Sequence, residues 1–413
     1  MTFVLAVLLQ QELVERALAE NDREKRRELC AQLRKHDFAA VEKGVRTRAY
    51  GAPAVALGEV VRRSSRTAHD GEAFEYALHV PKAYDPSKAW PLLVTLHGTN
   101  REGRADAGAG WITAWLSNEA VRERFIVVAP TTVRHTWSSR QGHSHVLTAI
   151  DEVARDLHVD PDRVVLDGMS MGAGGAFDLA EYHPDRFAAI APRCGAPDVR
   201  RRKDGALVAM LCENFRNVPI HWVVGAKDER IPIDIVRAAR DAIAALKYAC
   251  DYREHAEGGH DWSLGKDDEI AAWFEKQRRP TYPDEVVWKS YEKGFPGAYW
   301  VEATGRTDAT PILTAHLDMN ARESETRAEF RPPVVIRARR TGNAVDVTCE
   351  EAKGLRVWLD DAMFDLDKPV TVTVNGKRLF DGRAKRSVDT LIDEARRRRD
   401  RAMTFSAYVD VKP

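Results

Sequence analysis

Hydrophobic residues recur with two different spacings along this chain. Between residues 12 and 43 they follow a helical repeat beside a strongly charged face, which predicts a solvated helical pair packed on a larger body. Pro53 and Gly58 end that pattern. From Phe74 to Val80 every second residue is apolar, which predicts a half-buried strand.

Short, almost fully apolar runs follow, separated by loop residues and helical segments. We expect strands at residues 92–96, 125–129, 164–166 and 220–224, and helices at residues 144–157, 173–183 and 233–246. Continuous apolar strands that alternate with helices are typical of a parallel sheet covered on both faces. The predicted fold class for residues 53–280 is therefore α/β, with a doubly wound, mostly parallel sheet.

Beyond Pro280 the alternation of strands and helices ends. Short strands are expected at residues 334–338, 344–348, 355–359, 370–374 and 377–380. Asn375-Gly376 between the last two is a strong hairpin signal. Residues 281–413 are thus predicted to form a mainly β module with one helix near 387–401, and residues 1–52 an N-terminal helical segment. Arg396–Arg399 is interpreted as a solvated helix face, not a phosphate-binding patch, because acidic residues share the helix.

Charge and composition narrow the function. Among 413 residues, Lys+Arg and Asp+Glu both number 63, so no general attraction to nucleic acid is expected. No apolar run approaches the roughly 20 residues that span a bilayer. The run from Phe3 to Leu9 is interpreted as the start of an amphipathic helix; a signal peptide is the alternative, so the compartment stays open.

Cysteines and histidines give no sign of a metal or a disulfide framework. The five cysteines lie far apart without a C-x-x-C pair, which predicts free, mostly buried thiols. His143 and His145 have no carboxylate at a familiar ligand spacing, so no metal and no cofactor are expected.

The most informative segment is Gly168-Met169-Ser170-Met171-Gly172, which follows an apolar strand and opens a helix. A sharp strand-to-helix turn of this kind presents a serine oxygen at the carboxyl edge of the sheet. The serine then lies at a helix N-terminus, where backbone N–H groups favour developing negative charge. Ser170 is the predicted nucleophile.

A serine hydroxyl needs a base and a group that orients the base. Asp228 follows the strand at 220–224 by four residues, and His260 lies in a glycine-rich loop before the last helix of the domain. Both come after Ser170 in the order this fold uses. Asp228 and His260 are the predicted acid and base, and the neighbours Glu229 and His255 rank below them.

Two backbone N–H groups should stabilise the oxyanion, those of Met171 and Thr99, with His97 as a buried structural histidine. Trp111, Trp115 and Trp137 are predicted to lie in loops at this edge of the sheet. They either bind a sugar or phenolic acyl group or pack beneath a lid. Met169 is expected to line or underlie the site.

The segments around His97-Gly98, Gly168–Gly172, Asp228 and Gly258–Trp262 resemble the α/β-hydrolase superfamily. More narrowly, with residues 159–164 and 183–192 added, they are similar to the branch of feruloyl esterases, acetyl-xylan esterases and polyhydroxybutyrate depolymerases. The resemblance covers residues 72–278. The cysteine pattern of the disulfide-linked secreted forms has no match here.

The resulting expectation is a serine hydrolase that cleaves carboxylic esters without a cofactor, on a small-molecule or polysaccharide-linked substrate. A prolyl-oligopeptidase-like peptidase and an acyltransferase share the same elbow, so they remain open. A third alternative is a glycan- or partner-binding protein that works through residues 281–413. We favour a brace or dimer surface for that module, because Trp288, Trp300 and Trp358 are scattered and expected in its core; a homo-oligomer is compatible with the sequence.

Overall fold

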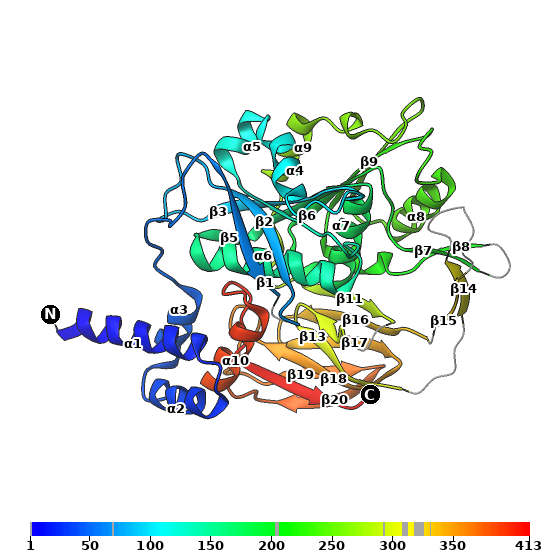
Figure 1. Cartoon of the computed structure of the whole chain (residues 1–413). Helices are drawn as coiled ribbons and strands as arrows, with labels where there is room; N and C mark the ends of the chain where they lie inside the picture. Colours follow the sequence, from blue (N-terminus) through cyan, green and yellow to red (C-terminus); the bar gives the residue numbers. More distant parts are fainter. Residues whose placement is uncertain are drawn as a thin grey trace.

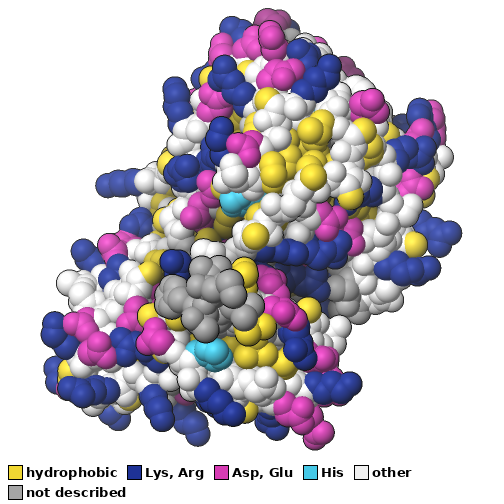
Figure 2. Space-filling model, turned by 90° about the vertical axis from the view of Figure 1, so that its left-hand side faces the viewer, with side chains coloured by type: hydrophobic (Ala, Val, Ile, Leu, Met, Phe, Trp, Pro, Cys, Tyr) yellow, Lys and Arg dark blue, Asp and Glu magenta, His cyan; other side chains and the backbone are white. Residues whose placement is uncertain are grey.

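The computed structural model describes residues 2–67, 70–202, 206–291, 294–307, 313–317, 326–330 and 332–413. A central α/β domain lies above a C-terminal β module in Figure 1, and the N-terminal helices lie beside that module. Figure 2 shows Lys and Arg interspersed with Asp and Glu over the face that it presents, in agreement with the equal totals of the two kinds.

Three helices, where a helical pair was predicted, lie at the start of this chain: α1 (Thr2–Ala19), α2 (Arg23–Leu33) and α3 (Phe38–Arg46). Asp22 and Asp37 cap the second and third, since each carboxylate accepts backbone N–H groups of the first turn. The apolar faces of all three pack with α10 (Val388–Arg398) in one small core. None of the helices in the described part of the chain is long and apolar enough to cross a membrane.

The central sheet has eight strands in the order β1-β2-β4-β3-β5-β6-β9-β10. Their bounds are β1 Val60–Arg66, β2 Ala73–His79, β3 Trp90–Leu96, β4 Ile126–Pro130, β5 Val159–Met169, β6 Ala189–Arg193, β9 Ile220–Gly225 and β10 Cys250–His255. β2 pairs antiparallel with β1 and β4, and every pair from β4 to β10 is parallel. The predicted mostly parallel sheet is confirmed, and the carboxyl ends of six strands share one edge.

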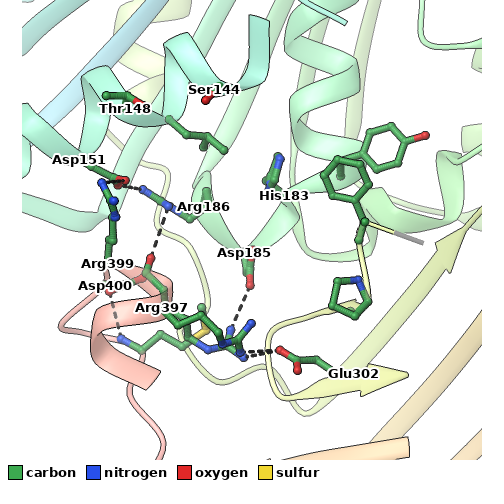
Figure 3. A pocket seen from close by; sticks show the side chains of 18 residues that line it. Ser144, Thr148, Asp151, His183, Asp185, Arg186, Glu302, Arg397, Arg399 and Asp400 are labelled. Carbon is green, nitrogen blue, oxygen red and sulfur yellow. Dashed lines mark hydrogen bonds and ion pairs between the residues drawn. The ribbon is translucent and has the colours of Figure 1, made fainter. Parts of the chain in front are cut away.

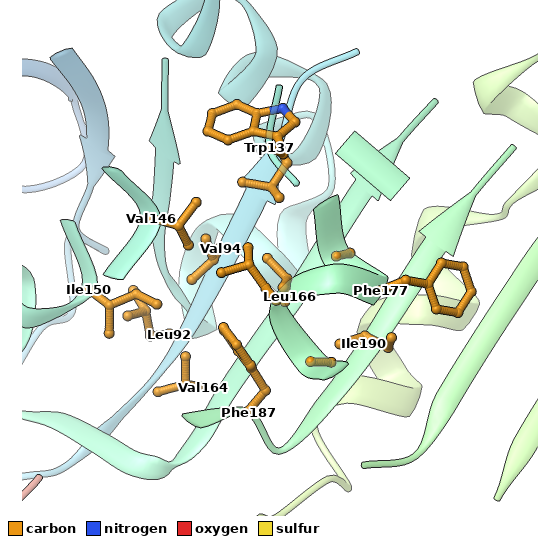
Figure 4. Close-up of a cluster of buried hydrophobic side chains, with 14 of the residues drawn as sticks. Leu92, Val94, Trp137, Val146, Ile150, Val164, Leu166, Phe177, Phe187 and Ile190 are labelled. Atoms are coloured by element: carbon orange, nitrogen blue, oxygen red, sulfur yellow. The ribbon is translucent and has the colours of Figure 1, made fainter. Parts of the chain in front are cut away.

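Helices cover both faces of this sheet because its strands are apolar on both sides. α6 (Arg140–Asp156), α7 (Met171–Tyr182) and α8 (Ile233–Leu246) pack on one face, where Leu92 and Val94 of β3 contribute to the core in Figure 4. α4 (Ala107–Leu116), α5 (Glu119–Arg124) and α9 (Asp267–Phe274) pack on the other, against Leu93. Such a doubly wound arrangement leaves the loops at the carboxyl edge free to carry chemistry.

The C-terminal module consists of two sheets packed on a shared apolar core. One contains β11 (Glu285–Ser290), β16 (Val334–Thr341), β17 (Ala344–Glu350), β19 (Val370–Val374) and β20 (Lys377–Gly382), and the other β12 (Gly297–Ala298), β13 (Val301–Arg306), β18 (Ala352–Leu359) and β21 (Ala407–Val411). Asn375 and Gly376 take φ values of 50° and 78° in the β19–β20 turn, which explains the Asn-Gly pair. Trp288, Trp300 and Trp358 are buried, as predicted.

A fourth sheet joins the two parts of the molecule. The hairpin of β14 (Leu313–Leu317) and β15 (Thr326–Phe330) from the C-terminal module extends the hairpin of β7 (Val199–Arg202) and β8 (Leu207–Ala209) from the central domain. β14 pairs antiparallel with β7. Backbone hydrogen bonds therefore link the module to the segment that follows β6.

The interpretation of Arg396–Arg399 as a solvated helix face holds for Arg397 and Arg399, which are exposed, but is wrong for Arg398. Arg398 is almost buried and lies 3.3 Å from both Asp185 of the central domain and Glu302 of β13. Arg399 contacts Asp151 of α6 at 3.3 Å. The remaining two bind Leu18 and Asn21 (Arg396) and Glu302 and Glu394 (Arg397). The run serves as a clamp between the three parts of the chain, which sequence spacing alone could not reveal.

Candidate active site

Ser170 lies in the sharp turn between β5 and α7. Its φ of 56° and ψ of −119° are strained for a residue with a side chain. The turn closes because Gly168 and Gly172 approach other backbone atoms: a Cβ on Gly168 would collide with Gly172 O, and one on Gly172 with Leu96 O. These contacts account for both glycines of the motif and leave Ser170 half-buried at the carboxyl edge of the sheet.

Asp228 and His260 form a hydrogen-bonded pair beyond the end of β9. His260 Nδ1 lies 2.8 Å from Asp228 Oδ2, while Asp228 Oδ1 accepts the N–H groups of Arg230 and Ile231 at 2.8 and 3.0 Å. Burial works against the charged carboxyl, yet the hydrogen bonds from His260 and these two N–H groups outweigh it and lower the pKa of Asp228. Glu229 and His255, the lower-ranked neighbours, are exposed.

The end of β6 brings the elbow and the pair together. Ser170 N–H donates to Arg193 O at 3.0 Å, and a Cβ on Gly195 would lie 3.2 Å from Ser170 O. Between these two residues, Cys194 places its Sγ within 4.8 Å of ligand atoms of both Asp228 and His260. His260 Nε2 is buried and accepts no hydrogen bond from the described residues, so its lone pair is available.

A glycine contact also fixes the loop that carries His260. A Cβ on Gly225, the last residue of β9, would collide with the carbonyl oxygens of Gly258 and Gly259. The backbone of the loop therefore rests directly on the strand that precedes Asp228. This close approach explains glycine at position 225, whereas a Cβ on Gly258 would lie 2.9 Å from the side chains of His255 and Leu264.

The predicted oxyanion loop lies against Ser170. A Cβ on Gly98 would be 3.6 Å from the Cβ of Ser170. His97 is buried; its Nδ1 donates to Gly98 O at 2.6 Å and its Nε2 accepts Thr132 N–H at 3.2 Å. Burial lowers the pKa of His97, which keeps this neutral form. The ring of His97 thus holds the plane of the Gly98–Thr99 peptide, and this buried histidine positions the predicted oxyanion loop.

The predicted aromatic substrate contacts need correction. Trp115 and Trp137 are completely buried, on α4 and before α6 respectively, so neither ring is available for stacking on a substrate. Trp137 Nε1 donates to His97 O at 2.9 Å. Trp111, also on α4 and not in a loop, is half-buried and donates to Thr95 Oγ1 at 2.9 Å. Of the four proposed contacts, Trp111 and Met169 keep some exposed surface.

The buried guanidinium of Arg193, beneath the site, was not predicted from the sequence. Arg193, the last residue of β6, lies 3.2 Å from Asp167 and 2.6 Å from Asp267. Its guanidinium stacks on Trp262 at 3.5 Å from the ring centroid and faces Trp115 at 4.8 Å. Because Trp262 follows His260 by two residues, the cation anchors the base-bearing loop. A lone arginine at the end of an unpredicted strand carries no signal of this role.

Groups of side chains that could bind a metal ion are rare in the described part of the chain. His143 and His145 do not share an ion: His143 Nε2 pairs with Asp178 at 2.7 Å, and the ring of His145 stacks on Phe74. In the described part of the chain one group of three meets the distance requirement, Cys194, Asp228 and His260. All five cysteines are free, as predicted, and four of them are buried.

A cavity of about 440 Å³ lies away from these residues, between the central domain and the C-terminal module (Figure 3). Arg186, Arg397, Arg398 and Arg399 line it, but each is paired with a carboxylate: Arg186 lies 2.6 Å from Asp151. None of Ser170, Asp228 and His260 lines this cavity. Its charges belong to the clamp between the modules.

Comparison with known proteins agrees with this geometry. Residues 68–266 match the Esterase family, described as "Putative esterase". The Aspergillus terreus protein named "Probable feruloyl esterase C" is 29% identical over 165 residues, which are 39% of this chain and 57% of that protein. Poly(3-hydroxyalkanoate) depolymerase C of Paucimonas lemoignei is 31% identical over 133 residues, 29% of this chain and 30% of the depolymerase.

The chain thus spans less than two thirds of the length of either relative. A solved structure described as a thermostable esterase superposes with a TM-score of 0.45 at 21% identity, over 54% of this chain and 64% of that one. The central part of the chain, residues 68–266, is thus similar to the Esterase family.

Proposed function

We propose that this protein hydrolyses carboxylic esters through Ser170, His260 and Asp228. The observation that carries the proposal is the Asp228–His260 hydrogen bond of 2.8 Å at the carboxyl edge of the sheet, beside the strained turn that holds Ser170. An Asp–His pair next to a serine at a strand-to-helix turn is the arrangement that activates a hydroxyl for acyl transfer.

In the proposed mechanism, Ser170 Oγ attacks the acyl carbon and His260 Nε2 takes its proton. Asp228 accepts the Nδ1–H, which fixes the tautomer that leaves Nε2 unprotonated and stabilises the imidazolium that forms. His260 then gives the proton to the departing alcohol. Water, deprotonated by His260, releases the acyl group from Ser170.

The N–H groups of Met171 and Thr99 would stabilise the oxyanion. The N–H of Met171 belongs to the first turn of α7, whose N–H groups have no acceptor within the helix. The peptide that carries the N–H of Thr99 is held by His97. Removal of one such donor costs about 3 kcal/mol of transition-state stabilisation in comparable enzymes.

The names of the relatives and the rim of the site support a proposed substrate class. Relatives are named as feruloyl esterase, acetylxylan esterase and polyhydroxyalkanoate depolymerase, all of which act on esters. Met169, which precedes Ser170, and Trp111 of α4 are partly exposed apolar side chains. The proposed substrates are phenolic or carbohydrate-linked esters.

Hydrolysis of p-nitrophenyl acetate, butyrate and octanoate and of methyl ferulate tests the proposal. Ser170→Ala should lose activity by about 10⁴-fold or more, because the covalent step is removed. Ser138→Ala, at an exposed serine of the loop after β4, is the matched control and should retain it. Ester hydrolysis that survives in Ser170→Ala, or cleavage of peptide anilides in preference to every ester, would contradict the proposal.

A further inference from the structure

Cys194 lies at the end of β6, between the turn that carries Ser170 and the Asp228–His260 pair. Its φ is 50°, its N–H donates to Val223 O at 2.9 Å, and its side chain is buried. Its Sγ donates to the backbone oxygen of Asp261 at 3.3 Å. The proposed hydrolysis gives this thiol no task, although it lies beside the groups that would perform the reaction.

The three side chains at this point form a set of metal ligands. Cys194 Sγ, a carboxylate oxygen of Asp228 and a ring nitrogen of His260 all lie within 4.8 Å of one another. In a tetrahedral zinc site, with Zn–S near 2.3 Å and Zn–N or Zn–O near 2.0–2.1 Å, neighbouring ligand atoms are about 3.3–3.5 Å apart. Side-chain rotations that bring the three atoms to this spacing would complete the set.

The charges around the sulfur favour a cation. The carboxylates of Asp228 and Asp261 lie near it, whereas the positive charge of Arg193 is engaged by Asp167 and Asp267. Sulfur, imidazole nitrogen and carboxylate oxygen together suit a borderline-soft ion such as Zn²⁺ and suit Mg²⁺ or Ca²⁺ poorly.

We propose that Cys194, Asp228 and His260 bind one thiophilic divalent cation, Zn²⁺ or Cd²⁺, and that the bound ion inhibits the hydrolase. Binding at three residues of one chain leaves a fourth position on the ion for water. The inhibitory half of this inference rests on the proposed function, while the binding half depends only on the ligand set.

Inhibition follows from the proton balance. On binding, the thiol of Cys194 releases its proton to solvent and the sulfur forms the metal bond. If the ion takes Nε2 of His260, it occupies the lone pair that would accept the Ser170 proton. If it takes Nδ1, the proton that resided there moves to Nε2, and the base is again lost. Either mode of binding stops the first step without removing a residue.

The test uses the full chain after treatment with a chelator. Cd²⁺ is titrated while the cadmium–thiolate absorbance is followed, and Zn²⁺ is titrated into the p-nitrophenyl butyrate assay. Cys194→Ser keeps a hydroxyl that can donate to Asp261 O but lacks the soft ligand. Cys250→Ser changes a half-buried cysteine on β10 and is the matched control. Each variant is compared with itself in the presence of chelator.

The expected result is one cadmium–thiolate site in the wild type and in Cys250→Ser, absent in Cys194→Ser. The Zn²⁺ concentration for half-inhibition should rise at least tenfold in Cys194→Ser only. Equal sensitivity of all three proteins, or activation by Zn²⁺, overturns the inference while leaving the ester hydrolase intact. A Cys194-dependent cadmium site in a protein that hydrolyses no ester supports the binding half and instead refutes the proposed function.

Discussion

Replacement of Arg193 by methionine removes the buried cation under the candidate site and so tests its contribution to stability and activity. The side chain of Arg193 is almost fully buried, and so is that of Asp167, which also accepts Trp115 Nε1 at 2.8 Å and Thr95 Oγ1 at 3.1 Å. Burial raises the pKa of Asp167 even though Arg193 and these hydrogen bonds oppose it. Without the arginine, this carboxyl has no cation in contact.

Loss of one partner of a buried ion pair costs about 3–5 kcal/mol. For a domain of this size, each kcal/mol lowers the thermal midpoint by about 2–4 °C, so Arg193→Met should lower it by about 6–20 °C in differential scanning calorimetry. The loss of stability in Arg193→Met should increase as the pH rises. Folding then requires Asp167 to take up a proton that the unfolded chain does not hold.

Activity should fall together with stability, since the stack of Arg193 on Trp262 holds the loop of His260. A displacement of about 1 Å in that loop corresponds to roughly a 10²-fold loss of kcat. The matched control is Arg193→Met combined with Asp167→Asn, which removes the unpaired charge. We expect the double variant to regain most of the lost stability and to lose the pH dependence. A double variant as unstable as the single one would refute the reasoning.

Three further predictions concern His97, Asp228 and Arg398. His97→Asn should lower kcat for ester hydrolysis by about tenfold or more with little change in KM, because the ring orients a predicted oxyanion donor without touching the substrate; an effect on KM alone would contradict this. The pKa of Asp228 is lowered, so its carboxylate should stay ionised in mildly acidic solution. As the pH is lowered to about 4, log(kcat/KM) should therefore fall with a slope of one proton. A slope of two protons would show that Asp228 titrates as well. Arg398→Ala should cost about 2–3 kcal/mol, seen as a lower thermal midpoint, while kcat stays within about twofold, since its partners lie between the modules; loss of kcat would disprove a purely structural clamp.

The elements that sequence predicted correctly are those with strong local signals. The strand that ends before Ser170 carries the apolar run 164–166, and Gly168 and Gly172 on either side of the serine are required by backbone contacts that any side chain would prevent. The choice of Ser170, Asp228 and His260, in that order along the chain, rested on the same alternation of strands and loops. The structure brings Asp228 and His260 into contact. Their order along the chain implies such a contact but gives no distance.

The unpredicted features depend on partners that are remote in sequence. β6 is short and consists largely of alanine, which has a low strand propensity, and β10 is an edge strand of mostly polar residues without a continuous apolar run. Arg193 can be buried only because Asp167 and Asp267 meet it in space. The sequence placed Trp115 and Trp137 after the correct strands, yet the direction of each ring was set by buried acceptors, Asp167 for Trp115 and the carbonyl of His97 for Trp137.

The small core of the N-terminal helices has a consequence for biosynthesis. Val14, Leu33 and Val41 pack against Leu391 and Ile392 of α10, which the ribosome adds more than 340 residues later. α1, α2 and α3 leave the ribosome before α10 and therefore wait, with their apolar faces uncovered, until α10 has been made. The α/β domain can complete its sheet during this interval, so α1, α2 and α3 close onto α10 only after the central sheet has been made.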